Sequence, residues 1–589
     1  MDETPHGKLL QLLVSDEVKN YFASITEKQA DLNFDKTRHN LNKPFPNDAL
    51  ITWEDELKNL TKKCFPETVK QNLQILEDYI KLCLENGAKP IGVMLPFAPM
   101  MHDNYNQELL ISFRLAMDQL KKIYPFQFVD LFDLRLDYSH FYNMAHLNIK
   151  GSIVASSILS VTLHAQNILP FENLCKMNYD FFNNLTQYLA KNDYNALMDR
   201  VFKVSVQKIR QKEKIKIGFI LYDSSMWCGD EIYNSFAQNE RYEVTIFLCL
   251  RKDKYKNGNV IKDFWHGVEQ FKTKGLNVVA ISEFDANIPK QDVLIFLTPY
   301  LEVLPDAFHF NKITAETLTV YVPYGFNSSG LAIHNLPLMR CAWKIFFETK
   351  FDLQEYDKKC SVGMPRGYYS GYSKLDVFFK KKFPAFEWKR TIPNSKKIIW
   401  APHWSINGGI KYATFQWNYQ FMYELARRYP QISWVVKPHP NLIFSAVESG
   451  IFPDIDAFKA YLQKWNELPN AKVETGAYYQ EIFATSDGMI QDCGSFIGEY
   501  QYTHKPMIFL TRDTQKFNEL GNELMQVLYR VDGRDFNGIL ALIQKIFIDG
   551  KDEMFYARMK FFDAYCNYQK ENGMLASEFI FKTISQELQ

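Results

Sequence analysis

The chain has 589 residues, enough for three or four domains that each bury a core of their own. Its 68 basic and 68 acidic residues balance, which excludes a global electrostatic attraction to nucleic acid or to an anionic membrane surface. Nine dispersed cysteines without a CxxC pair indicate reduced thiols rather than a disulfide framework or a zinc site, and no apolar run approaches the ~20 residues of a membrane span.

The first 170 residues alternate between helical and strand patterns. An amphipathic helix is predicted over 66–85, and Asn86-Gly87 after it matches a helix C-cap. Further elements follow in this order: a strand over 90–95, a helix over about 106–123, a strand over 126–132 and a helix beginning near 153. Strands that alternate with helices favour a parallel sheet.

The segment FYNMAHLNIKG, residues 141–151, resembles the last sequence block of SGNH-type hydrolases and acyltransferases. In that family an Asp three residues before the His completes a Ser-His-Asp triad, whereas this chain has Asn143 before His146. The Gly-Asp-Ser-like nucleophile turn of the family is also missing near the start of the chain. We therefore expect residues 1–170 to be a degenerate, partly flavodoxin-like domain retained for packing or acceptor docking, with His146 in a structural role. An active SGNH enzyme and an unrelated α/β structure are the alternatives.

A helical pattern over 171–213 ends in the charged run VQKIRQKEKIK. A basic helix facing a membrane is one interpretation. Because the charges alternate in sign, the sequence favours a solvated helical linker between domains.

Residues 214–390 have the pattern of a Rossmann-like domain, beginning with the apolar strand KIKIGFILY that ends at Asp223. Further strands are predicted over 242–250, 278–282, 293–298, 318–322 and 343–348, with a helix near 353–359. The domain has neither a GxGxxG nor a GxxxxGK[ST] sequence, so the common dinucleotide and P-loop fingerprints are absent.

Residues 391–589 repeat the pattern as a second Rossmann-like domain followed by helices. Strands are predicted over 398–401, 432–436, 488–491 and 506–510, and helices over about 411–428, 478–485, 516–528, 536–548 and 553–583. The last helix carries an aromatic face and is expected to pack back across the first Rossmann-like domain. Two such domains with a crevice between them predict the GT-B architecture of glycosyltransferases.

Polar side chains follow the strands of the second Rossmann-like domain. In such folds ligands bind at the carboxyl ends of the strands. A Gly-Ser turn that opens a helix offers free N–H groups and a positive dipole end to a phosphate. The candidate nucleotide-binding and phosphate-binding residues are His403, Lys437, Asp492, Gly494, Ser495 and Glu499, and His439 is a candidate catalytic residue beside the phosphate. No Asp-x-Asp pair stands at a strand end, so no metal is assigned to the site.

The ordered set APHWS, KPHP and QDCGS followed by Glu499 and a Lys-Pro strand resembles the CDP-glycerol glycerophosphotransferase family of teichoic-acid and capsule polymerases. The resemblance covers roughly residues 395–530, and it implies that His439 and Ser495 bind the diphosphate of a CDP-linked donor. The family has a Trp-His-Gly turn whose His is the expected base, but this chain has Pro323-Tyr324-Gly325. His334 and Asp223 are the candidate substitutes, since a phenol is a poor base at neutral pH.

We therefore expect a metal-independent capsule or surface-polysaccharide transferase without a resident cofactor. It would move a phosphorus-containing group, of the glycerol phosphate or O-methyl phosphoramidate type, from a CDP-activated donor to a sugar hydroxyl and release CMP. The alternatives are a GT-B glycosyltransferase that uses a nucleotide sugar and a non-catalytic scaffold of a capsule-assembly complex. The expected partners are the activated donor and a polysaccharide or sugar acceptor, not nucleic acid. The expected location is cytoplasmic, and peripheral association with the inner membrane or a capsule-assembly complex is compatible with it.

Overall fold

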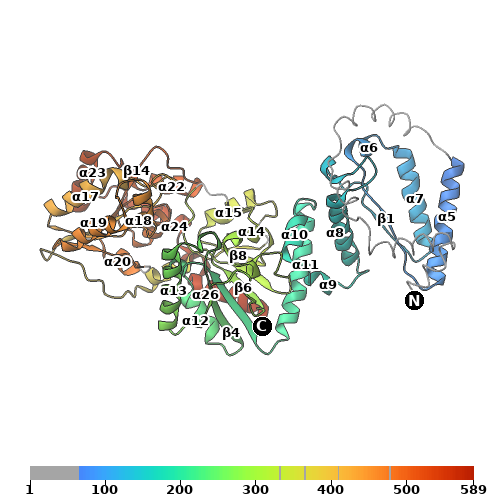
Figure 1. Cartoon of the computed structure of the whole chain (residues 1–589), viewed down its shortest axis with the longest axis horizontal. Coiled ribbons are helices and arrows are strands. Elements are labelled where there is room, and N and C mark those ends of the chain that lie inside the picture. The colour runs from blue at the N-terminus through green and yellow to red at the C-terminus, as the bar shows by residue number, and fades with distance from the viewer. Residues whose placement is uncertain (1–65, 330–332, 364–365, 409, 477–478) are drawn as a thin grey trace. The chain divides into compact units, whose positions relative to one another are not determined.

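The computed structural model describes residues 66–329, 333–363, 366–408, 410–476 and 479–589, and the predictions for residues 1–65 lie outside this part. The described chain divides into two compact units. The first unit takes in the chain up to Leu174 together with Gln187–Ala190, and the second unit is the rest. Figure 1 gives the course of the chain through both.

The first unit has the alternating pattern that the sequence predicts. Its elements are α5 (Pro66–Glu85), β1 (Ile91–Met94), α6 (Pro99–Asp103), α7 (Gln107–Ile123), β2 (Gln127–Asp130), η1 (Tyr138–His140), α8 (Ile149–Ala165) and α9 (Glu172–Cys175). Strands β1 and β2 pair in parallel, as the alternation requires. Helix α8 begins earlier than expected, because the side chain of Asn148 accepts the backbone N–H of Gly151 and caps it.

The second unit opens with two helices and a seven-stranded parallel sheet. The strands are β3 (Ile215–Leu221), β4 (Tyr242–Cys249), β5 (Val278–Ile281), β6 (Val293–Phe296), β7 (Leu318–Tyr321), β8 (Lys344–Phe347) and β9 (Gly367–Tyr369). Their order is β5-β4-β3-β6-β7-β8-β9. The helices are α10 (Tyr179–Leu185), α11 (Lys191–Arg210), α12 (Asp230–Ala237), α13 (Gly258–Thr273), α14 (Pro337–Cys341), α15 (Lys350–Lys359) and α16 (Asp376–Lys380).

Helix α11 differs from the solvated linker that its charges favoured. Its buried side contacts the first Rossmann-like domain: Ser205 Oγ donates to the carbonyl of Ala315 (2.6 Å), and Asn195 Nδ2 donates to the carbonyl of Val362 (2.6 Å). Only the face with the alternating charges meets solvent. The helix is therefore part of the Rossmann-like domain, because its buried residues outweigh the charged run at its end.

A second parallel sheet of six strands follows. The strands are β10 (Lys396–Ala401), β11 (Ile432–Val436), β12 (Ala471–Val473), β13 (Gly488–Gln491), β14 (Met507–Thr511) and β15 (Tyr529–Asp532). Their order is β12-β11-β10-β13-β14-β15, the doubly wound order of a Rossmann fold. The helices are α17 (Phe415–Arg428), α18 (Leu442–Glu448), α19 (Ile455–Glu467), α20 (Gln480–Thr485), α21 (Phe496–Glu499), α22 (Glu519–Gln526) and α23 (Phe536–Leu542). Three buried tryptophans, Trp400, Trp434 and Trp465, anchor the core of this domain.

The expected single helix over 553–583 is instead three helices. These are α24 (Phe555–Tyr565), α25 (Tyr568–Asn572) and α26 (Ala576–Leu588). Gly573 breaks the run with φ of 67°, a left-handed conformation that glycine adopts without a steric penalty. The last of the three, α26, returns to the first Rossmann-like domain (Figure 1). Its Phe581 packs on Phe236 of α12 with ring centroids 4.9 Å apart.

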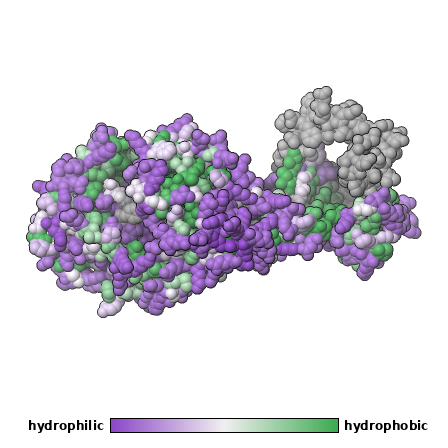
Figure 2. Space-filling view, turned by 90° about the horizontal axis from the view of Figure 1, so that it is seen from below, coloured by the Kyte–Doolittle hydropathy of each residue, from purple (hydrophilic) through white to green (hydrophobic). Residues whose placement is uncertain are grey.

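Two doubly wound parallel sheets joined by a final helix that packs back on the first sheet confirm the predicted α/β class and GT-B architecture. On the face of the second unit in Figure 2, hydrophilic residues cover most of the surface and hydrophobic residues form scattered patches. None of the helices in the described ranges combines the length and the apolarity needed to cross a membrane.

Candidate functional site

The candidate site lies where the strands of the second Rossmann-like sheet end. Strands β10 and β13 are neighbours although they are not consecutive in the chain, so the strand order reverses between them. Ligands of doubly wound sheets bind at this reversal, outside the carboxyl ends. The loop after β10 carries His403, the loop after β11 carries Lys437 and His439, and the loop after β13 carries Asp492 to Ser495.

Asp492 joins two of these loops. Its Oδ1 accepts the backbone N–H of His403 (2.6 Å), and its Oδ2 accepts the backbone N–H (2.6 Å) and the Oγ1 hydroxyl (2.8 Å) of Thr414. Burial raises the pKa of Asp492 to about 6, and these donors oppose that rise. Because three donors of the chain already occupy the carboxylate, its role in the structure is to hold the loop after β10 against the loop after β13.

His403 is buried and neutral. Its Nδ1 accepts the backbone N–H of Ser405 (3.2 Å) and lies 2.8 Å from Ser405 Oγ, which itself accepts the backbone N–H of Tyr412 (2.8 Å). Burial, with a smaller contribution from His439, lowers the pKa of His403 well below its usual value. With Nδ1 used as an acceptor, the ring proton resides on Nε2, so this imidazole is a hydrogen-bond donor.

His439 has the same tautomer by a different contact. Its Nδ1 accepts the backbone N–H of Asn441 (3.1 Å), and its ring centroid lies 5.3 Å from that of His403. Burial, then the charge of Lys437, lowers the pKa of His439 to about 3. The two neighbouring histidines are therefore both neutral, and both present an Nε2–H.

Lys437 is the buried cation of the site. Its Nζ donates to the carbonyl of Gly476 (2.7 Å), and the side chain is 6% exposed. Burial lowers the pKa of Lys437 to about 8, which the carboxylate of Glu474 opposes. An ammonium has three N–H donors, and those not used for this carbonyl can donate to an anion.

The turn at Gly494 and Ser495 differs from the expected helix N-terminus. Helix α21 is only four residues long, and the Ser495 side chain makes no capping hydrogen bond. The Ser495 hydroxyl lies 3.4 Å from the Sγ of Cys493, and the backbone N–H groups of Ser495 and Phe496 also face that sulfur. A thiol is a weak acceptor, so these donors are held in a cluster without a strong partner there.

Glu499 is not open to solvent. It is 2% exposed, and its carboxylate accepts the hydroxyl of Tyr479. Burial raises the pKa of Glu499 to about 7, and Lys374 and the Tyr479 hydroxyl oppose that rise. The structure thus brings Lys374, from the segment after β9, to this site. Sequence reasoning missed it, because no motif marks the residue.

The first Rossmann-like domain contributes Asp223 at the end of β3. Its Oδ1 accepts the backbone N–H of Ser225 (2.8 Å), and the residue is exposed. Three tyrosines stand at neighbouring strand ends of the same sheet, namely Tyr222, Tyr300 and Tyr324. Burial raises the pKa of Tyr324, and the other two tyrosines add to the rise, so its phenol stays protonated.

His334 lies elsewhere. It is 9% exposed, and its Nδ1 has no hydrogen-bond partner among the described residues. Burial, then Lys359, lowers its pKa, while Glu355 opposes the shift. The charged groups that shift its pKa thus belong to α15, and no contact between His334 and His439 is present among the described residues.

A loop of the first Rossmann-like domain reaches the second at the turn of Gly494 and Ser495. Ser328 Oγ donates to the carbonyl of Gly494, and the backbone N–H of Asn518 donates to the carbonyl of Ser328 (3.1 Å). A Cβ on Gly498 would lie 2.3 Å from the ring of Phe326, so glycine is needed for this approach. These loops of the two Rossmann-like domains are therefore in direct contact.

The segment around His146 in the first unit has a defined geometry. Asn143 Oδ1 accepts the backbone N–H groups of Ala145 (3.0 Å) and His146 (2.9 Å) and lies 2.8 Å from His146 Nδ1. Two N–H donors identify that atom as oxygen, so His146 carries its proton on Nδ1. The arrangement stabilises the turn, which is compatible with the structural role predicted for His146.

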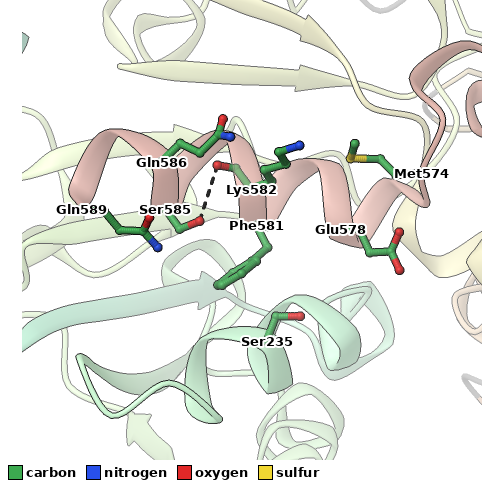
Figure 3. A pocket seen from close by; sticks show the side chains of 8 residues that line it. All are labelled: Ser235, Met574, Glu578, Phe581, Lys582, Ser585, Gln586 and Gln589. Atoms are coloured by element: carbon green, nitrogen blue, oxygen red, sulfur yellow. Dashed lines mark hydrogen bonds between the residues drawn. The ribbon is translucent and has the colours of Figure 1, made fainter.

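A separate hollow of about 460 Å³ lies between α26 and α12 (Figure 3). It is lined by Ser235, Met574, Glu578, Phe581, Lys582, Ser585, Gln586 and Gln589. Glu587, in the same stretch of α26, bonds Lys344 at the start of β8, so the hollow lies toward the amino ends of the strands. It holds none of the candidate residues. Within the described ranges no cluster of His, Cys, Asp or Glu could hold a metal ion.

Comparison with known proteins gives fold relatives only. No family model matches the chain, and no curated protein matches it. A solved structure of MnaA from S. aureus with UDP is 14% identical, with a TM-score of 0.42, over 64% of this chain and 97% of that chain. UDP-GlcNAc 2-epimerase from Neisseria meningitidis bound to UDP-GlcNAc is 13% identical, with a TM-score of 0.40, over 63% and 100%. A variant of the wall teichoic acid polymerase TagF is 13% identical, with a TM-score of 0.42, over 74% and 98%.

Proposed function

We propose that this protein is a transferase of surface-polysaccharide assembly that takes a phosphorus-containing group from a CDP-activated donor and passes it to a sugar hydroxyl. The transferred group is of the glycerol phosphate or O-methyl phosphoramidate type. CMP is the leaving group.

The observation that carries the proposal is the pair of neutral imidazoles beside a buried lysine. His403 and His439 lie with ring centroids 5.3 Å apart, and each has its Nδ1 occupied by a backbone N–H. Both Nε2–H groups are therefore donors, and Lys437 adds a positive charge next to them. Donors that are already oriented stabilise charge that develops on a phosphate without reorganising.

The reaction forms one P–O bond and breaks another. The acceptor hydroxyl oxygen attacks the distal phosphorus of the donor, and the P–O bond to CMP breaks with its electron pair going to CMP. Lys437, the two imidazoles and the Ser495 hydroxyl would stabilise the leaving phosphate. His439 acts in this scheme as a hydrogen-bond donor and not as the base, because its Nε2 carries the proton.

The proton of the acceptor hydroxyl needs a base on the other side of the crevice. Asp223 suits this role better than His334, since it is exposed at a strand end and close enough to Lys374 to influence its pKa. Tyr222, Tyr300 and Tyr324 beside it offer aromatic faces for a sugar ring. The guanidinium of Arg251 lies 4.8 Å from the centre of the Tyr222 ring and adds donors at the same place.

The test combines nucleotide binding with analysis of the product. Calorimetry of the full chain with CMP, CDP and UDP is expected to give binding of the cytidine nucleotides. Mass spectrometry of the surface polysaccharide from a strain without this protein is expected to find a phosphorus-bearing substituent missing.

Two outcomes would replace the proposal. A missing sugar together with binding of a nucleoside diphosphate would indicate a GT-B glycosyltransferase that uses a nucleotide sugar. Absence of all nucleotide binding with an unaltered polysaccharide composition would indicate a non-catalytic scaffold.

A further inference from the structure

Lys374 stands at the carboxyl edge of the first sheet, in the turn η6 (Ser373–Leu375) that follows β9. Contacts fix this segment on both sides. Ser373 Oγ donates to the carbonyl of Cys228 (2.8 Å), and Tyr372 Oη donates to the carbonyl of Tyr324 (2.5 Å). Gly371 has φ of 83°, and a Cβ at this position would lie 2.0 Å from the ring of Tyr568. Only glycine therefore fits at this position.

The side chain of Lys374 reaches into the second Rossmann-like domain. Its Nζ lies 4.5 Å from the ring centroid of Tyr479, and the hydroxyl of that tyrosine bonds Glu499 at the end of α21. The Tyr479 ring also packs on Phe496 with centroids 5.0 Å apart, so the ammonium is held beside the turn that begins at Ser495. Among the described residues, Lys374 Nζ has neither a hydrogen bond nor an ion pair within bonding distance.

Lys437 is the other lysine of the candidate site, and the charge of Lys374 acts on it. Burial lowers the pKa of Lys374, while Glu499, the Cys228 thiol, Asp230 and Asp223 oppose the shift. The positive charge of Lys374 also contributes to the lowered pKa of Lys437. Two partly desolvated ammonium groups that repel each other are both stabilised when an anion binds to them.

We propose that Lys374 binds the distal phosphate of the nucleoside diphosphate, so that the diphosphate is held by both Rossmann-like domains. The inference rests on the proposed function, in which the proximal phosphate contacts Lys437, His439 and Ser495. In this proposal the transferred group faces the first Rossmann-like domain, where the acceptor binds. Lys374 is a cation of that domain and lies beside the turn of Gly494 and Ser495. CMP lacks the distal phosphate, so its binding requires phosphate contacts from the second Rossmann-like domain only.

The experiment compares CDP with CMP in the full chain. Lys374→Met keeps most of the aliphatic stem and removes the charge. We expect it to weaken CDP binding at least 10-fold while changing CMP binding less than 3-fold, as measured by calorimetry. Lys374→Arg should retain most of the CDP affinity, and Lys382→Met, at an exposed position a few residues later, should leave both affinities unchanged.

The outcomes separate this inference from the proposed function. Equal losses for CDP and CMP would indicate that Lys374 only supports Tyr479 and Glu499, and no loss for either would also overturn the proposal. If the wild type binds no cytidine nucleotide, the same variants are tested with UDP against UMP and with inorganic pyrophosphate. Loss of pyrophosphate binding in Lys374→Met would then support the anion site while the CDP donor is rejected. Absence of binding to every probe would overturn both.

Discussion

Asp492 Oδ1 accepts the backbone N–H of His403 at 2.6 Å, so a carboxylate at the end of β13 fixes the loop that follows β10. Its Oδ2 accepts hydrogen bonds from the backbone N–H and the hydroxyl of Thr414. The sequence places Asp492 among the candidate nucleotide ligands. The contacts show how the two loops that flank the strand reversal are held together, and the binding role of Asp492 stays a prediction.

Asp492→Ala is expected to destabilise the second Rossmann-like domain. Leaving the donors of His403 and Thr414 without an acceptor in a buried place costs about 1–3 kcal/mol for each unsatisfied group. Chemical denaturation should therefore give a lower free energy of unfolding, and nucleotide binding should weaken with it. Asp513→Ala, an exposed position in the loop after β14, is the control and should change stability by less than about 0.5 kcal/mol. Equal stability of the two variants would contradict the role given to Asp492.

Substitutions at His439 separate a hydrogen-bond donor from a base. Removal of an oriented donor to a developing oxyanion costs about 10²–10³-fold in turnover, and His439→Ala should show a loss of that size with an unchanged melting temperature. His439→Gln keeps a side-chain N–H but cannot accept a proton, so it should recover about 10-fold over alanine if the residue is a donor. His266→Ala, on the exposed face of α13, is the control and should leave turnover unchanged. A glutamine variant as inactive as the alanine variant would favour a base, and wild-type turnover of the alanine variant would refute the site.

The affinity for CMP should depend on pH through Lys437. Its pKa in the folded, unliganded protein is about 8, so the ammonium that attracts the phosphate is lost as the pH rises through that value. Calorimetry between about pH 7 and pH 10 should give a falling affinity, and Lys437→Met should bind more weakly and with a shallower slope. Stability moves in the opposite direction. Because the folded pKa is below the unfolded value, the unfolded chain binds more protons between these two pKa values, and this residue makes stability rise with pH there.

An ion pair between Lys344 and Glu587 links the final helix α26 to strand β8 of the first Rossmann-like domain. Lys344 Nζ donates to Glu587 Oε1 at 2.5 Å, and the lysine side chain is 2% exposed while that of Glu587 is 47% exposed. Glu587→Ala leaves a buried ammonium without its carboxylate, and the expected cost is about 1–3 kcal/mol, at the lower end because water reaches the glutamate. The double variant Lys344→Met with Glu587→Ala should recover part of the loss. A double variant less stable than Glu587→Ala alone would argue against an uncompensated charge.

Several elements were predictable because their signals are local. Strands β11 (Ile432–Val436) and β13 (Gly488–Gln491) have the predicted bounds, since buried apolar runs end abruptly at Lys437-Pro438 and at Asp492. Helix α5 likewise ends where Asn86-Gly87 predicts it. Strands β12 and β15 were missed because they are short edge strands, partly exposed, with a neighbour on one side only.

The sequence by itself determined the α/β class, the two doubly wound domains and the set of polar residues at the strand ends. Alternation of apolar runs with amphipathic segments is a property of the chain alone, and parallel strands place their carboxyl ends at one edge. Only the tertiary structure decided what each polar group does. The occupied carboxylate of Asp492 and the approach of Lys374 to Tyr479 depend on atoms far apart in sequence, and no local pattern encodes such contacts. The tautomers of His403 and His439 depend on the folded conformation of their loops.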